Sequence, residues 1–272
     1  MSELRIKDGV AVVTGAASGI GAGLVRQALK LGMRVVAADV QADKLAALAA
    51  GLGDKVLPVT CDVTSPQSLA ALAERAWSAF GGVDLLFNNA GIMNTGFIWE
   101  IDAQRWQRSL EVNVLGVVNG LRAFVPRLLK DGRRAHIVNT ASVGGFLASP
   151  LMAPYSATKF AVVGLTESLR GELEMLGADI GVSLLAPGPV HSSIFDRPYG
   201  DDPSPAAQQF VATMRGMLDA HGLSPEAFAE RVFAGIGQNQ FWLIPQPETL
   251  DAALKQKCED ILARRNPVLP KF

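Results

Sequence analysis

Short apolar segments rich in β-branched residues alternate with longer amphipathic segments along the chain. The short segments predict strands at residues 10–14, 34–39, 56–62, 83–88, 136–142, 181–186 and 241–245. In the longer segments apolar residues return every three or four positions, which predicts helices at residues 20–31, 44–52, 69–80, 105–129, 155–176 and 225–236. The strand segments are almost continuously apolar, as expected of strands covered on both faces. The pattern predicts an α/β fold, a doubly wound parallel sheet of about seven strands with helices on both faces.

The organisation of the chain favours one domain. A length of 272 residues is within the range of a single large domain, and no internal repeat or low-complexity tract interrupts the sequence. The one stretch rich in Pro, Gly and Asp, residues 198–205, is typical of a surface loop rather than of a linker. We therefore expect residues 1–272 to form a single domain.

The charge of the chain is nearly balanced, with 25 Lys and Arg residues against 26 Asp and Glu residues. Such a balance provides no field to attract nucleic acid or an anionic membrane, so the expected partner is a small molecule. No uncharged apolar stretch reaches about 18 residues, and the first residues lack the apolar core of an export signal. The two cysteines, Cys61 and Cys258, are far apart in sequence and are interpreted as reduced thiols. These features predict a soluble cytoplasmic protein.

A glycine-rich turn follows the first predicted strand and leads into the first predicted helix. It contains Gly15, Gly19 and Gly21, with Ser18 and Ile20 between them. Glycine lets the backbone approach a pyrophosphate closely, and the free N–H groups and dipole of the helix attract the phosphate charge. The spacing Gly-x-x-x-Gly-x-Gly differs from the commoner Gly-x-Gly-x-x-Gly, and a purely structural turn is the alternative. In this position the turn predicts a Rossmann-type dinucleotide site.

Asp39 ends the second predicted strand, 18 residues after Gly21. An acidic side chain at this point can accept hydrogen bonds from both hydroxyls of the adenosine ribose, although a solvated Asp at a strand end is the alternative. The same carboxylate would repel the 2′-phosphate of NADP. No cation compensates, because Ser18 stands in the glycine turn and Val40 and Gln41 follow Asp39. The expected cofactor is NAD.

Tyr155 and Lys159 are four residues apart in a predicted helix, so their side chains lie on one face, one turn apart. A phenol has an ordinary pKa near 10, too high for an efficient base at neutral pH. A nearby ammonium group favours the phenolate, so we expect Lys159 to lower the pKa of Tyr155. The pair predicts general acid–base chemistry with Tyr155 as the proton carrier.

These motifs, in this order and spacing, resemble those of the short-chain dehydrogenase/reductase family. The resemblance covers residues 10–188, about two thirds of the chain, and rests on residues 14–21, Asn88-Asn89-Ala90-Gly91, Asn113, Ser142, Tyr155-x-x-x-Lys159 and Pro187-Gly188. Residues 221–248 are in addition similar to a subgroup that includes bacterial Cα-dehydrogenases of lignin-derived aryl ethers. The resemblance implies an NAD-dependent oxidoreductase that moves a hydride between a secondary alcohol or ketone and the nicotinamide ring.

The resemblance also implies catalytic roles. Tyr155 would exchange the proton with the substrate oxygen, and Ser142 would form a hydrogen bond to the same oxygen. Lys159 would hold the nicotinamide ribose, and Asn113 would anchor a water that leads to Lys159. Asn is unfavourable in the middle of a helix, where Asn113 is predicted to lie, so either this role or a buried structural hydrogen bond explains it.

Further residues would line the dinucleotide by the same resemblance. Asp62 and Val63 would contact the adenine, although Asp62 could instead cap a helix. The remaining residues expected there are Asn89, Ala90, Gly91, Pro187, Gly188, Val190 and Ser192, besides Tyr155 and Lys159. Ser192 stands where the family usually has Thr and retains the hydroxyl.

The three histidines and the possible metal ligands add little to this site. His191 is beside the expected nicotinamide segment and could contribute, but Tyr155 already fills the acid/base role. His136 and His221 are interpreted as structural or exposed. No set of His, Cys, Asp and Glu has the spacing of a metal site, so no catalytic metal is expected.

The substrate is expected outside the carboxyl ends of the strands, where ligands lie in open α/β sheets. Its walls would come from residues 92–97, 143–152 and 191–223, the last forming a substrate-binding loop or lid. Apolar side chains dominate there, although some could simply pack the loop onto the body: Phe146, Leu151, Met152, Phe195, Phe210, Met214 and Met217. They predict a bulky apolar or aromatic secondary alcohol or ketone. Members of the family mostly assemble through the helices that bear Asn113 and Tyr155, which implies a homotetramer or homodimer.

Two other functions compete with this one. A non-catalytic NAD-binding regulatory or scaffold protein on the same fold would typically lack the Tyr or the Lys, whereas both are present here. A sugar-nucleotide epimerase or dehydratase of the longer branch of the family would carry an additional substrate domain and a different glycine spacing. The length of the chain argues against the second.

Overall fold

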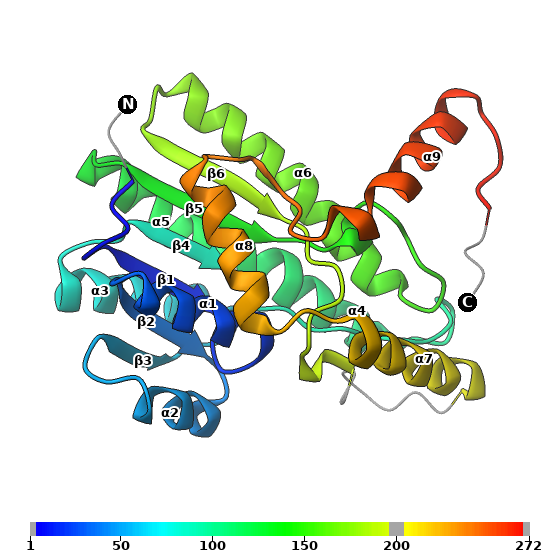
Figure 1. The fold of residues 1–272 in the computed structure, drawn as a ribbon, viewed down its shortest axis with the longest axis horizontal. Helices are drawn as coiled ribbons and strands as arrows, with labels where there is room; N and C mark the ends of the chain where they lie inside the picture. The colour runs from blue at the N-terminus through cyan, green and yellow to red at the C-terminus, as the bar shows by residue number, and fades with distance from the viewer. Residues whose placement is uncertain (1–3, 196–203, 269–272) are drawn as a thin grey trace.

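Parallel strands form a central seven-stranded sheet in the order β3-β2-β1-β4-β5-β6-β7 (Figure 1). The computed structural model describes residues 4–195 and 204–268. Its strands are β1 (Val10–Thr14), β2 (Arg34–Asp39), β3 (Val56–Thr60), β4 (Leu85–Asn88), β5 (Ala135–Thr140), β6 (Ile180–Leu185) and β7 (Trp242–Leu243). Every predicted strand is present, and the doubly wound parallel sheet is confirmed.

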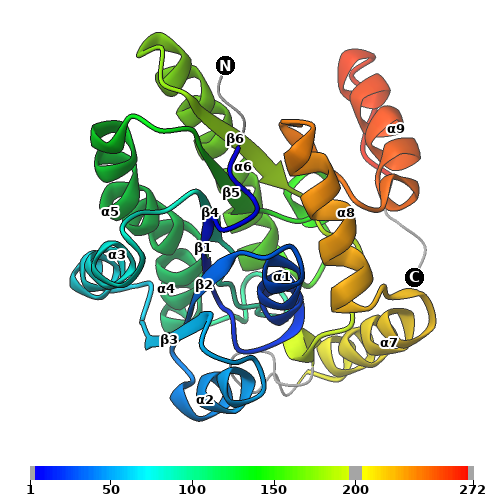
Figure 2. The same cartoon turned by 60° about the vertical axis from the view of Figure 1, so that its left-hand side comes forward.

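Helices cover the sheet on both faces (Figure 2). The helices α1 (Gly19–Lys30), α2 (Ala42–Ala50) and α8 (Pro225–Gly237) cover one face, and α3 (Pro66–Phe80), α5 (Gly116–Asp131) and α6 (Ala153–Met175) cover the other. Side chains along β1 point alternately to the two faces of the sheet. Ala11 and Val13 pack in the apolar cluster on one face, and Val10 and Val12 pack in the cluster on the other. Burial on both faces explains why the strands are continuously apolar in sequence.

The long helix predicted at residues 105–129 is a continuous run of α4 (Ala103–Leu110), a π-helical turn η1 (Glu111–Leu115) and α5. By length and hydropathy alone, the 29 residues Ala103–Asp131 would also suffice to cross a membrane. Phe124 and Leu128 of this run are buried in the cluster that includes the sheet and α3. A core helix of this kind passes the same test, so its composition is weak evidence for a membrane span.

Two helices were not predicted. The first, α7 (Pro205–His221), lies within the segment predicted as a loop or lid, and Ser204 caps it by accepting a hydrogen bond from Ala207 N (3.2 Å). The second, α9 (Asp251–Leu262), buries none of its residues. Of the surface loop predicted at residues 198–205, residues 198–203 lie outside the described residues.

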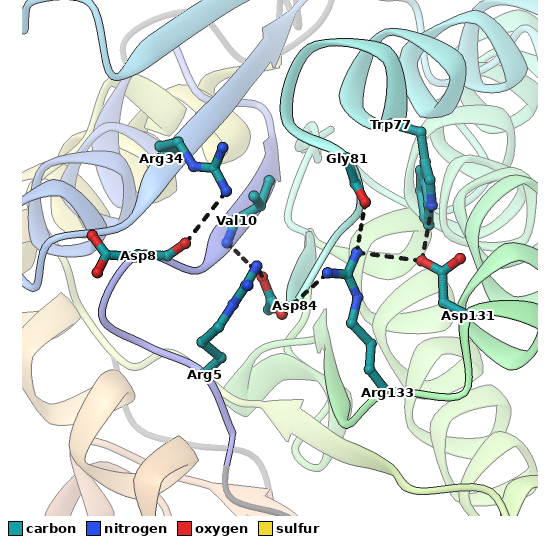
Figure 3. Close-up of polar contacts among 9 residues, drawn as sticks. All are labelled: Arg5, Asp8, Val10, Arg34, Trp77, Gly81, Asp84, Asp131 and Arg133. Atoms are coloured by element: carbon teal, nitrogen blue, oxygen red, sulfur yellow. Dashed lines mark hydrogen bonds and ion pairs between the residues drawn. The ribbon is translucent and has the colours of Figure 1, made fainter.

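A buried carboxylate ties the amino ends of the central strands together (Figure 3). Asp84, only 1% exposed, precedes β4 and accepts hydrogen bonds from Val10 N (2.7 Å) and from the guanidinium group of Arg5 (2.9 Å) through Oδ2. The guanidinium group of Arg133 lies 4.0 Å from Oδ1 and also donates to the carbonyl of Gly81. This network joins the N-terminal segment, β1, β4 and the approach to β5.

We expect Asp84→Ala to lower the free energy of unfolding by about 2–4 kcal/mol, because the buried Val10 N–H and the two arginines would lose their common acceptor. Urea unfolding of the variant measures the change, with Asp54→Ala, at an exposed carboxylate, as the control. The network lies at the end of the strands opposite the glycine turn, so NADH affinity should be retained. A midpoint equal to that of Asp54→Ala would show that the carboxylate contributes no net stability.

Candidate active site

The glycine-rich turn and the segment after β4 meet at the carboxyl ends of β1 and β4. These adjacent strands continue in opposite directions, β1 toward β2 and β4 toward β5, which creates the crevice where ligands bind in such sheets. Thr14 Oγ1 accepts hydrogen bonds from Asn89 N (2.9 Å) and Ala90 N (3.2 Å), and Asn89 Nδ2 donates to Thr14 O (3.0 Å). Thr14 therefore joins the two segments, a contact that the sequence did not reveal.

The glycines of the turn are required by close backbone approaches. Gly15 has a φ of +66°, and a Cβ there would lie 2.8 Å from Ala90 Cα. A Cβ at Gly21 would overlap the carbonyl oxygen of Gly15. Gly19 has a φ of +49°, and its Cβ would lie 2.8 Å from Ser192 Cβ. Glycine is therefore needed at these three positions, and the turn brings Ser192 beside Gly19, as expected of a shared site.

Asp39 is buried at the end of β2 and points at the glycine turn. Its Oδ2 accepts a hydrogen bond from Ala17 N (3.0 Å), and its Oδ1 accepts one from Gln41 N (2.9 Å). Each oxygen of a carboxylate has a second lone-pair site, so both remain able to accept a ribose hydroxyl. Val40 beside it is 57% exposed and apolar. The solvated strand-end alternative is wrong, because the Asp39 side chain is buried and hydrogen-bonded.

Asp62 forms a local turn after β3. Its Oδ1 accepts hydrogen bonds from Thr64 N (2.9 Å) and Thr64 Oγ1 (2.8 Å). Burial acts to raise the pKa of Asp62, but these two hydrogen bonds and the charge of Arg108 outweigh it and lower the pKa. The alternative that Asp62 caps a helix is wrong, because Ser65 caps α3 by accepting a hydrogen bond from Ser68 N.

The neighbouring Val63 is held by the long helix on the second face of the sheet. The Val63 side chain packs directly on Gly116, because a Cβ added at Gly116 would lie 2.9 Å from Val63 Cγ2. The Val63 carbonyl accepts a hydrogen bond from Asn119 Nδ2 (3.0 Å). Asn119 was missed at the sequence level, because its partner is 56 residues away in the chain. It fixes the segment expected to contact the adenine.

Asn113 lies in the π-helical turn η1 and is fully buried. Its Oδ1 accepts a hydrogen bond from Ile92 N (2.8 Å), and its Nδ2 donates to Ile92 O (2.9 Å) and to Thr158 Oγ1 (3.0 Å). Such turns within helices frequently mark functional sites. The buried structural hydrogen bonds, which were the alternative explanation of a mid-helix Asn, are present, and they connect Ile92, directly after the Asn-Asn-Ala-Gly segment, to α6.

Lys159 is buried in α6, one turn after Tyr155. Its Nζ donates to the carbonyl of Thr140 (2.8 Å) at the end of β5 and lies 5.6 Å from the centre of the Tyr155 ring. A Cβ at Gly91 would lie 3.4 Å from Nζ, so this glycine faces the ammonium group. Burial lowers the pKa of Lys159 to about 8.

Ser142 and Tyr155 both lie beside Gly144, in the short turn that follows β5. Ser142 begins the one-turn 3-10 helix η2 (Val143–Gly145) and accepts a hydrogen bond from Gly144 N (3.1 Å). A Cβ at Gly144 would lie 3.3 Å from the Tyr155 ring and 3.5 Å from Ser142 Oγ. The structure therefore brings together the two side chains expected at the reacting oxygen.

The expected lowering of the Tyr155 pKa is not found. Burial raises the pKa of Tyr155, and a hydrogen bond with Ser142 opposes this only in part. Lys159 does not reverse the effect because it is itself buried, and its ammonium group is directed to Thr140 O. The sequence showed the spacing of the pair but not the desolvation of both side chains.

The segment from Pro187 to Ser192 runs along the same crevice. The carbonyl of Pro187 accepts a hydrogen bond from Val143 N (3.0 Å), which attaches this segment to the Ser142 turn. A Cβ at Gly188 would lie 2.7 Å from Thr249 Oγ1, so glycine is needed there. Val190 is buried, whereas the side chain of His191 is exposed.

The two other histidines agree with their structural interpretation. His136 is buried and bonded to Ser183 Oγ (2.7 Å), and burial lowers its pKa to about 3, whereas His221 is exposed. Among residues 4–195 and 204–268, no three His, Cys, Asp or Glu side chains are grouped as metal ligands.

An apolar cluster adjoins Tyr155 on the side of α7. It contains Met93, Leu151, Met152, Tyr155, Phe195, Phe210 and Met214, among others. Two residues expected in this wall lie elsewhere: Phe146 packs edge-on against Trp242, and Met217 is 45% exposed on α7. The cluster provides an apolar surface next to the side chains that would exchange the proton.

A family model described as short chain dehydrogenase matches residues 9–201, well over half of the chain. The chain belongs to the short-chain dehydrogenase family. The matched region contains every catalytic residue expected from the motifs, and the seven-stranded Rossmann-like sheet is the fold of this family.

Several proteins similar to this short-chain dehydrogenase are named as dehydrogenases. A Cα-dehydrogenase of Sphingobium sp. (strain NBRC 103272 / SYK-6) is 36% identical over 259 residues, which cover 92% of this chain and 84% of that protein. A 1-deoxy-11-beta-hydroxypentalenate dehydrogenase of Streptomyces exfoliatus is 37% identical and covers 88% and 84%. A Burkholderia phymatum short-chain dehydrogenase/reductase crystallised in complex with NAD superposes with a TM-score of 0.93 at 38% identity, and the match covers 100% of both chains. The chain is therefore an oxidoreductase, and its similarity to the Cα-dehydrogenase agrees with the tail motif.

Proposed function

We propose that this short-chain dehydrogenase transfers a hydride between a bulky apolar or aromatic secondary alcohol or ketone and NAD, with Tyr155 as acid/base. The observation that carries the proposal is the juxtaposition of Ser142 and Tyr155 between the glycine-rich crevice and the apolar cluster. The relatives named Cα-dehydrogenase and 1-deoxy-11-beta-hydroxypentalenate dehydrogenase support the reaction class, and the apolar cluster supports the substrate class.

NAD fits the residues of the crevice. The glycine turn at residues 15–21 leads into the N-terminus of α1, where a pyrophosphate would meet free N–H groups, and buried Asp39 retains acceptor sites for ribose hydroxyls. Lys159 and Asn89 to Gly91 border the same crevice, with Pro187 to Ser192 on its other side. When bound, the nicotinamide ring accepts or donates the hydride. The NAD complex of the Burkholderia protein supports this choice.

Side chains of this protein would transfer the proton of the substrate hydroxyl group. In alcohol oxidation Tyr155, as phenolate, would take the hydroxyl proton of the substrate, and in ketone reduction the phenol would return a proton to the same oxygen. Ser142 donates a hydrogen bond to the substrate oxygen. Lys159 would hold the ribose, while Asn113 fixes the distance between η1 and α6 through Thr158 and would anchor a water on the path to Lys159.

We propose that residues 191–223, of which 196–203 lie outside the described residues, serve as the substrate-binding loop or lid of the single domain. Within the described part of this segment, α7 contributes Phe210 and Met214 to the cluster that contains Tyr155. The enzyme assembles as a homotetramer or homodimer through the long helix that bears Asn113, from α4 through η1 to α5, and through α6, which bears Tyr155, and it works in the cytoplasm. Free Cys61 and Cys258 support a reducing compartment.

Because burial raises the pKa of Tyr155, we expect alcohol oxidation to accelerate steadily as the pH rises above neutrality, and ketone reduction to stay nearly constant until the pH approaches the raised pKa. Below that pKa the small phenolate population needed for oxidation grows with every rise in pH, whereas the phenol needed for reduction remains the dominant form. Profiles of kcat/KM against pH in both directions measure this. An oxidation profile that is already flat at neutral pH would contradict a raised pKa.

The test of the function itself is a panel of secondary alcohols, from short aliphatic to bulky aryl, incubated with NAD and followed by NADH absorbance. We expect turnover to increase with the apolar bulk of the substrate. NADH binding without reduction of NAD by any alcohol would favour the non-catalytic regulatory alternative instead.

A further inference from the structure

The chain after β7 forms an arm, residues 246–262, which includes α9 and whose first residues are packed against the body. Gln246 is buried, and its Nε2 donates to the carbonyl of Pro189 (2.8 Å) in the segment expected beside the nicotinamide. Leu250, which follows the short helix η4 (Pro247–Thr249), is fully buried. Gln246 and Leu250 thus fix the start of the arm, and their packing sets the direction in which α9 leaves the body.

The helix α9 itself has no apolar anchor. None of its residues is buried, and it projects from the body (Figures 1 and 2). Burial of an apolar face is what normally holds a surface helix in place. In the described part of the chain, one hydrogen bond joins an α9 side chain to the body: Lys257 Nζ donates to the carbonyl of Phe146 (2.6 Å). The same ammonium group lies 4.6 Å from the centre of the Phe160 ring.

Both partners of Lys257 belong to the elements that carry the catalytic side chains. Phe146 ends the turn that Ser142 begins, and its N–H donates to Val143 O (3.0 Å). Phe160 follows Lys159 directly in α6. Lys257 therefore contacts the outer side of the Ser142 turn and of the Tyr155 helix at one point.

The 142–146 turn has little room for movement on its inner side. A Cβ at Gly145 would lie 2.8 Å from Lys159 O, and one at Gly144 would lie 3.3 Å from the Tyr155 ring. A single 3-10 turn is marginal by itself, and a cation at its last carbonyl satisfies that acceptor and complements the turn dipole. Release of the Phe146 carbonyl would let the turn lift away from α6 and move Ser142 relative to Tyr155.

We propose that Lys257 is a positioning residue that holds the 142–146 turn against α6 and thereby keeps Ser142 at the reacting oxygen. This inference rests on the proposed function. It gives Lys257 a role in the alcohol or ketone step and no role in binding the dinucleotide.

Three variants of α9 test the inference. Lys257→Met removes the donor at similar length, Lys257→Arg keeps a charged donor, and Lys255→Met makes the same change at an exposed lysine of the same helix. For Lys257→Met we expect kcat/KM for the alcohol to fall by about three- to thirtyfold, the effect of losing one partly exposed charge-assisted hydrogen bond. The dissociation constant for NADH, from fluorescence titration, should stay within about twofold of wild type. Lys257→Arg should recover most of the loss, and Lys255→Met should equal wild type.

Hydrogen exchange provides a readout that needs no turnover. Peptides that cover residues 142–147 and α9 should exchange faster in Lys257→Met than in Lys255→Met, because the local opening free energy falls when the tie is lost. Unchanged alcohol kinetics in Lys257→Met, or a loss of NADH affinity as large as the loss in kcat/KM, would overturn the inference. If the wild-type enzyme oxidises no alcohol, the proposed function fails, and equal exchange in the two variants would separately show that Lys257 does not hold the turn.

Discussion

Tyr155→Phe is expected to abolish alcohol turnover while NADH still binds with nearly wild-type affinity. The substitution removes the phenolic oxygen and retains the ring, which is buried in the apolar cluster and packs beside Gly144. General acid–base catalysis contributes about 10²–10⁴-fold to rate, so kcat should fall by a factor in that range. No other side chain that the structure describes at the Ser142 turn is placed to take over the proton, since Lys159 Nζ is engaged by Thr140 O.

The measurement is kcat for one active alcohol, together with the dissociation constant for NADH from fluorescence titration. Urea unfolding of the variant provides the control for stability, because the phenol oxygen is buried and its removal leaves the Ser142 hydroxyl with a changed environment. Retention of kcat within a few-fold of wild type would exclude Tyr155 as the acid/base. A parallel loss of NADH affinity would assign the residue to cofactor binding instead.

The wild-type enzyme should prefer NAD over NADP by at least about a hundredfold in kcat/KM. A charge-assisted hydrogen bond contributes about 1.5–3 kcal/mol, and each 1.4 kcal/mol is about tenfold in affinity. We expect Asp39 to supply this contact to the ribose of NAD and to repel the 2′-phosphate of NADP. Its two oxygens also hold Ala17 N and Gln41 N, so Asp39→Ala should weaken both cofactors through the turn while narrowing the ratio between them.

The ratio of kcat/KM values for NAD and NADP separates these effects. Asp43→Ala, which removes a carboxylate from an exposed position four residues later, is the control for long-range charge. Adding Val40→Arg to Asp39→Ala places a cation at an exposed position next to the site and should narrow the ratio further or reverse it. A ratio that does not respond to Asp39 would mean that the ribose lies elsewhere.

The parts of the molecule that could be predicted from sequence are those whose physical cause is local. Strands β1 and β2 have the predicted bounds, because burial on both faces requires continuous apolar runs. The glycine turn was recognisable because close backbone approach excludes side chains, as at Gly15 and Gly21. The spacing of Tyr155 and Lys159 predicted their adjacency, because residues four apart share a helix face.

The parts that could not be predicted depend on contacts between distant residues or on the absence of burial. Helix α9 buries none of its residues, so it has no strong apolar period to detect. The upward shift of the Tyr155 pKa comes from burial by segments remote in sequence, which a helix pattern does not contain. Asn119 and Val63 meet only once the sheet has formed, and so do Ser192 and Gly19.

Transfer of deuterium from a secondary alcohol labelled at the carbinol carbon to NAD tests the proposed reaction most directly. The enzyme would be incubated with NAD and the labelled alcohol in unlabelled water, and the NADH formed would be analysed by mass spectrometry. Direct hydride transfer predicts one deuterium in the nicotinamide ring of each NADH formed, with the proton from the hydroxyl released through Tyr155 to solvent. NADH without the label, or no NADH from any alcohol of the panel although NADH binds, would contradict the proposed reaction.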